Sequence, residues 1–355
     1  MGGARSSSGL VTALATLLFL LPLSIWLRYS RRIVSAGGLY AFVEAAAGTL
    51  LARIQAALWI LSYALYLVYT GPYIVYELLP AAFPGITPYQ PALVVLLALL
   101  VATILMSTLT VTLLVVAVVA LAQVVVTIAL ALASLARYGA PVGAFTGHGD
   151  FPAVASATAG VSLLYICASL PLFLGGEVGG GSRRVRDGLG WGFAAVAALV
   201  SLAAIPIAAA PSALLQTPVP GVALAGALAG QGFKTLVGIA AAVSALGLIL
   251  AEFLALSRLL SVLTRRPPEL LVRALAALLV VASLVVLIDP SRVYPLLLRP
   301  SLIALWLSQL MVVAVYPWFE ARHGRLGLGD VGLAAGSSAL MLYGLYSSAV
   351  NPLGT

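Results

Sequence analysis

The sequence predicts an all-α integral membrane protein of about ten transmembrane helices. Of its 355 residues, 63% are hydrophobic and only 8% are charged, whereas soluble domains use about 45–50% apolar and about 25% charged residues. The mean hydropathy is +1.15. The apolar residues form long continuous runs and do not alternate with a period of two, which predicts a helical bundle and not a barrel. Together these observations exclude a water-soluble protein.

The apolar runs, read in chain order, define the predicted spans. A bilayer core about 30 Å thick is crossed by about 20 apolar helical residues. The first run is longer than the apolar core of a signal peptide and ends without a small-residue cleavage site, which predicts a retained helix. In order, the runs predict spans at residues 9–27, 52–80, 91–108, 110–136, 155–176, 189–210, 232–263, 271–288, 297–319 and 328–349.

The third and fourth spans are separated by a predicted turn. Residues 91–136 contain no charged side chain, but as one helix they would be about 70 Å long. The chain must therefore fold back, and residues 107–110 (Ser-Thr-Leu-Thr) mark the place. Ten spans of about 20 residues leave only short loops, so residues 1–355 are interpreted as a single transmembrane domain.

The basic residues predict an orientation. Assigning alternate loops to the two sides places thirteen of the eighteen Lys and Arg residues on one side, which the positive-inside rule makes cytoplasmic. Both termini of a ten-span chain then face outward. Because the basic residues are scattered between apolar runs and form no stripe, they do not indicate a nucleic-acid partner. The expected surroundings are a lipid bilayer.

Three motifs carry a family resemblance. Residues 35–44 (SAGGLYAFVE) follow a basic loop after the first span, Gly176-Glu177 precedes a basic segment at 182–186, and Ser257-Arg258 precedes Arg-Arg-Pro at 265–267. In order and spacing these segments resemble the amino acid–polyamine–organocation permeases over most of the chain. The resemblance implies the inverted-repeat permease fold.

On that mapping the ten spans correspond to the family's second to eleventh helices. Residues 1–137 would form a partial first repeat of four helices, residues 155–319 a second repeat of five, and residues 328–349 an extra C-terminal helix. The family's first and last helices have no counterpart, so either the reading frame starts late or the first helix has been lost.

The resemblance implies a substrate site where the family's sixth helix is broken at mid-membrane. The matching residues here are Tyr165, Ile166, Cys167, Ala168 and Ser169. Pro171 removes one backbone hydrogen bond and disfavours helical geometry before it, which would free carbonyls near Ile166 and Cys167. The family usually has glycine and an aromatic residue here, so the substrate class stays open. A proline kink satisfied by neighbouring helices is an equally good interpretation.

Three further side chains are candidates because of their depth. Glu252 lies within a long apolar run, where burying a carboxylate costs about 2.5–3.5 kcal/mol. A structural ion pair with a neighbouring helix is favoured for it over a role in ion coupling. Tyr63 and Tyr66 are the deepest members of a tyrosine stripe and could line a pathway, whereas the outer tyrosines fit an interfacial belt.

The resulting functional expectation is a secondary transporter for amino acids or related small organic cations, working by alternating access, with H+ or Na+ as candidate coupling ion. A non-transporting scaffold or accessory subunit derived from a permease is the alternative, and a respiratory proton-channel subunit is a third. No enzyme chemistry, cofactor or metal site is expected. His148 and His323 fall on opposite sides, and the G-x-G-x-x-G string at 327–332 follows no strand.

Overall fold

The computed structural model describes residues 7–145, 150–177, 179 and 181–350. In this part of the chain the secondary structure consists of α-, 3₁₀- and π-helices without any strand. The predicted all-α class is therefore confirmed. His148, and residues 178 and 180 near the second family motif, lie outside the described residues.

Within the described residues, ten helices are long and apolar enough to cross a membrane. Each overlaps one predicted span, which supports a multi-pass membrane protein, while the division into two repeats stays a prediction. The spans are α1 (Ser8–Tyr29), α3 (Thr49–Tyr73) continued by η2 (Ile74–Leu78) and α4 (Leu79–Ala82), η3 (Pro84–Tyr89) with α5 (Gln90–Leu105), α6 (Leu109–Tyr138), α7 (Phe151–Ile166) with η5 (Cys167–Leu174), α8 (Gly181–Ala209), α10 (Pro220–Thr264), α11 (Pro268–Val286), α12 (Pro290–Ala314) with α13 (Tyr316–Arg322), and α14 (Leu328–Val350). Short helices α2 (Leu39–Ala47), η4 (Val142–Phe145) and α9 (Ser212–Leu215) lie between them.

The predicted turn between the third and fourth spans is confirmed. The α5 helix ends at Leu105 and α6 begins at Leu109. Thr108 is the N-cap of α6, and its hydroxyl accepts a hydrogen bond of 3.3 Å from the Val111 N–H. A threonine N-cap satisfies one of the backbone donors that a helix start leaves open, which favours the start of α6 at this place.

The seventh span starts earlier than the sequence predicts. The α10 helix begins at Pro220 and contains a kink at Ala229 and Gly230, where Gly230 has a φ of +78°. Glycine adopts this conformation without the steric cost of a side chain. The kink separates a short helical segment at 220–229 from the membrane-crossing part of α10.

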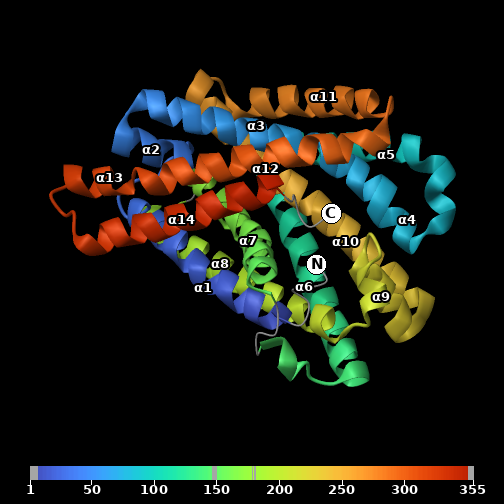
Figure 1. Cartoon of the computed structure of the whole chain (residues 1–355). Helices are drawn as coiled ribbons and strands as arrows, with labels where there is room; N and C mark the ends of the chain where they lie inside the picture. The colour runs from blue at the N-terminus through green and yellow to red at the C-terminus, as the bar shows by residue number, and fades with distance from the viewer. Residues whose placement is uncertain (1–6, 146–149, 178, 180, 351–355) are drawn as a thin grey trace.

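The α3 and α12 helices run side by side (Figure 1). The Gln55 amide donates to the Ser308 hydroxyl at 3.1 Å, and the Ser301 hydroxyl donates to the Ser62 carbonyl at 2.9 Å. Small hydroxyl residues allow close approach and hydrogen bonds between helices in lipid. This polar contact fixes the position of α3, which carries Tyr63 and Tyr66.

The contact between α12 and α14 depends on a single glycine. A Cβ atom on Gly344 would lie 2.5 Å from the Trp306 ring, and that ring is held by a 3.0 Å hydrogen bond from its Nε1 to the Ser348 hydroxyl. We expect Gly344→Ala to lower the free energy of unfolding by about 1–3 kcal/mol through overpacking, measured by thermal unfolding in detergent. Gly332→Ala is the matched control, because nothing lies within 4 Å of that position in the same helix. Equal unfolding temperatures for the two variants would contradict this account.

Candidate functional site

The fifth span changes its helix type at Cys167. The α-helix α7 ends at Ile166, and the chain continues as the 3₁₀-helix η5 from Cys167 to Leu174, with Pro171 inside it. Proline lacks the N–H that an α-helix needs and restricts the preceding residue. A stretch of 3₁₀-helix within a span often marks a functional hinge. The α-helix is therefore interrupted beside the predicted site residues.

The expected free carbonyl at Ile166 is not observed. The Ser169 hydroxyl donates to it at 2.8 Å, so this part of the prediction is wrong. Ser169 is fully buried, and its hydroxyl satisfies this backbone carbonyl just before η5. Ile166 and Ala168 are buried apolar side chains, which leaves Cys167 as the chemically distinctive residue of the break.

Tyr165 is turned toward other helices. Its hydroxyl shares a 2.7 Å hydrogen bond with the Thr16 hydroxyl of α1. Its ring packs against Phe19 of α1 and Phe193 of α8, with centroid distances of 5.5 and 5.2 Å. Tyr165 therefore anchors the end of α7 to α1 and α8.

Four of the predicted residues do come together. Tyr63 and Tyr66 of α3, Cys167 of η5 and Glu252 of α10 lie close together where these three elements meet. We call these four residues the Glu252 cluster. Tyr63 and Glu252 are 3% and 1% exposed, whereas Cys167 and Tyr66 are partly exposed. The cluster is thus a polar site enclosed by three different spans.

Two polar atoms in the Glu252 cluster lack partners. Among the described residues, neither the Glu252 Oε2 nor the Tyr63 hydroxyl, both buried, has a hydrogen-bond partner. The sequence favours an ion pair for Glu252, but the structure does not show one. The ion pairs found among the described residues all involve other carboxylates. Buried polar groups are normally paired, so an unpaired group calls for an explanation such as a ligand, a proton or water.

An aromatic layer covers the cluster toward the predicted cytoplasmic side. The Trp59 ring stacks on Tyr63 at 4.1 Å and contacts Phe173 of η5 at 4.5 Å between centroids. Sequence reasoning missed both Trp59 and Phe173, because nothing in a single sequence shows that α3 and η5 meet there. Trp59 lies about one helical turn before Tyr63 in α3, toward the predicted cytoplasmic end of that span.

A salt bridge lies on the same side of the cluster. The Arg258 guanidinium of α10 donates from Nε and Nη2 to the two Glu177 carboxylate oxygens, at 2.9 and 3.2 Å. The Arg258 side chain is 8% exposed and the Glu177 side chain 32%. Such a bidentate pair is among the stronger charge-assisted contacts. It ties the chain just after η5 to α10.

Tyrosines cover the opposite side of the cluster. Tyr66 contacts Tyr69 at 5.2 Å, and Tyr294 of α12 contacts both Tyr69 and Tyr73 at 5.4 and 5.1 Å between centroids. These tyrosines belong to the stripe that the sequence shows in the second span. The Glu252 cluster therefore lies between two aromatic layers.

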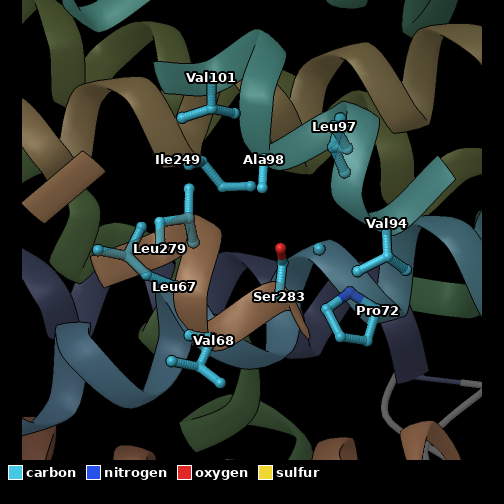
Figure 2. Close-up of a pocket in the computed structure, with 12 residues that line it drawn as sticks. Leu67, Val68, Pro72, Val94, Leu97, Ala98, Val101, Ile249, Leu279 and Ser283 are labelled. Atoms are coloured by element: carbon cyan, nitrogen blue, oxygen red, sulfur yellow. The ribbon is translucent and has the colours of Figure 1, made fainter. Parts of the chain in front are cut away.

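A separate pocket lies between α3, α5, α10 and α11 (Figure 2). The cavity volume open to a water molecule is about 20 Å³, which is enough for about one water. Figure 2 shows Leu67, Ile249 and Val94 directed into it, with the Ser283 hydroxyl as the polar atom among the labelled side chains. That hydroxyl already donates to the Val280 carbonyl at 2.7 Å. This pocket offers little to a polar substrate.

The described residues bring no three His, Cys, Asp or Glu side chains together in a group that could hold a metal ion. His323 instead forms a 2.7 Å hydrogen bond with the Phe319 carbonyl.

Comparison with known proteins finds a likeness to solved structures. No family model matches the chain, and no curated protein matches it. Among solved structures, the chain is similar to a manganese transporter of Eremococcus coleocola, crystallised in complex with an aromatic bis-isothiourea substituted compound. The identity is 14% and the TM-score 0.48, over 97% of this chain and 86% of that one.

Proposed function

We propose that this protein is a secondary transporter that moves an amino acid or a related small organic cation by alternating access. One observation supports this above the others. Two buried and unpaired polar atoms, on Tyr63 and Glu252, lie beside the interruption of the fifth span at Cys167. Ionisable and polar groups inside a membrane domain usually mark a substrate or ion pathway.

The chemistry of the Glu252 cluster suits a substrate that carries an ammonium group. Tyr63 and Tyr66 offer hydroxyls for hydrogen bonds and ring faces that attract cations. Broken helices in transporters bind substrates near the bilayer midplane, and the motifs at residues 35–44 and 176–186 add the permease resemblance. The two aromatic layers would open alternately to the two sides.

Counterflow in proteoliposomes tests the proposal. Vesicles holding the purified protein are loaded with unlabelled amino acids and small organic cations, and entry of the labelled mixture is followed. We expect entry above that of protein-free vesicles. Absence of counterflow for every compound would reject transport and favour the scaffold or accessory subunit.

Tyr63→Phe tests the site itself. The substitution removes a hydroxyl without a partner and keeps the ring that stacks on Trp59. We expect the KM to rise up to about tenfold, the worth of one hydrogen bond of about 1.4 kcal/mol, with the unfolding temperature unchanged or higher. Tyr346→Phe in α14, where the side chain is exposed, is the matched control. A KM for Tyr63→Phe equal to that of the control would remove Tyr63 from the site.

A further inference from the structure

The carboxyl group of Glu252 is set apart from every other acidic group by its surroundings. It is 1% exposed, and its Oε2 has no hydrogen-bond partner among the described residues. By contrast, Glu177 and Asp330 form ion pairs and lie near the ends of spans. A buried acid without a partner is the exception that needs a physical account.

No cation neutralises Glu252 in the described part of the chain. The titratable groups that interact with it are Tyr63, Tyr66 and Tyr69 of α3 and Cys167 of η5. Arg258, the nearest arginine along α10, is already paired with Glu177. Elements packed against α10 also carry further charged residues, and none of them forms an ion pair with Glu252: Arg53 of α3, Glu77 of η2, Arg137 of α6, and Glu269 and Arg273 of α11.

This arrangement is incompatible with a permanently ionised side chain. An isolated carboxylate in a low-dielectric interior is so costly that the group neutralises instead. Glu252 has no arginine or lysine to pair with. Its neutral form is the carboxylic acid, in which one oxygen carries a proton. In this conformation the side chain of Glu252, which is 1% exposed, is held away from water as the protonated acid.

We propose that Glu252 binds and releases the proton that couples uptake of the substrate to a proton gradient. This inference rests on the proposed function. The carboxylate takes one proton from the outer side while the tyrosine layer of Tyr69, Tyr73 and Tyr294 is open, and the acid form stays in the occluded state. When the layer of Trp59 and Phe173 opens, the O–H bond breaks and the same proton leaves to the cytoplasm.

Glu252→Gln separates coupling from binding. Glutamine has nearly the shape of the protonated acid, but it can neither take up nor release a proton. Exchange of labelled for unlabelled substrate needs no net proton movement, so Glu252→Gln should still show counterflow above that of protein-free vesicles, even if its KM changes because Glu252 lies in the substrate site. With a pH gradient of one unit, acidic outside, the wild type should accumulate substrate up to about tenfold, since one unit is a tenfold proton ratio. Glu252→Gln should only equilibrate it.

Glu77→Gln is the matched control, because it makes the same chemical change at an exposed residue and should accumulate substrate like the wild type. A dye trapped in wild-type vesicles adds a readout that needs no variant, since substrate entry should acidify the interior. Accumulation by Glu252→Gln equal to the wild type, accumulation driven by a sodium gradient alone, or entry without acidification would each overturn the proton role. Absence of counterflow in the wild type would instead reject transport, and the coupling role with it.

Discussion

Modification of Cys167 by a small methanethiosulfonate reagent is expected to abolish transport. Cys167 is the one cysteine of the chain, so the wild type can be used without a cysteine-free background. It stands at the first position of η5 and belongs to the Glu252 cluster, so a small reagent should reach it when one of the aromatic layers opens. A mixed disulfide there adds bulk next to Tyr63 and Glu252, in the space that a bound substrate would need. Uptake should fall to the level of protein-free vesicles.

Substrate should slow this modification, because a substrate in the cluster would cover the thiol. Cys167→Ser is the matched control, since it keeps a small polar side chain and cannot react. Its transport should persist and resist the reagent. Mass spectrometry decides whether the wild type carries the added group. A fully modified protein that still transports at the original rate would place the substrate elsewhere.

The ten spans could be predicted because each depends only on the length of a local apolar run. The turn at 107–110 followed from the same rule, since a single helix over 91–136 would be too long for a bilayer. The sequence does not predict the early start of α10 at Pro220. Residues 220–229 follow two prolines and contain glycines, which resemble a loop, and the kink at Gly230 becomes visible only in the backbone φ of +78°.

The members of the Glu252 cluster could be named from the sequence, but their surroundings could not. Depth along a span singles out Tyr63, Tyr66 and Glu252, and Pro171 points to the break at Cys167. Which faces of the helices meet is decided by packing. The sequence predicts an ion pair between Glu252 and a neighbouring helix, yet no ion pair of the described residues includes Glu252. Arg258 of the same helix binds Glu177 instead, which is 81 positions away in the chain. Tyr165 likewise bonds to Thr16, at a separation of 149 positions.

Glu177→Gln is expected to destabilise the closed cytoplasmic side. The substitution leaves the Arg258 guanidinium, whose side chain is only 8% exposed, without its carboxylate. Removing one partner of a buried pair costs about 3–5 kcal/mol, and the partial exposure of Glu177 argues for the lower end. The unfolding temperature in detergent should fall. Because the bridge holds the chain after η5 against α10, its loss should also favour a state in which Cys167 is open to the cytoplasm.

The reaction of Cys167 with a membrane-impermeant thiol reagent measures that opening. For a shift of about 3 kcal/mol toward the open state, we expect the reaction from the cytoplasmic side to accelerate by up to about a hundredfold, since each 1.4 kcal/mol changes a population ratio tenfold. Asp187→Asn is the matched control, because the Arg183–Asp187 pair is 3.8 Å apart with side chains 85% and 62% exposed, and such surface pairs contribute little. If both variants reacted at the wild-type rate while only Glu177→Gln lost stability, the bridge would fasten η5 to α10 without closing a pathway. Acceleration confined to Glu177→Gln would mean that the same contact stabilises the fold and blocks access to the Glu252 cluster.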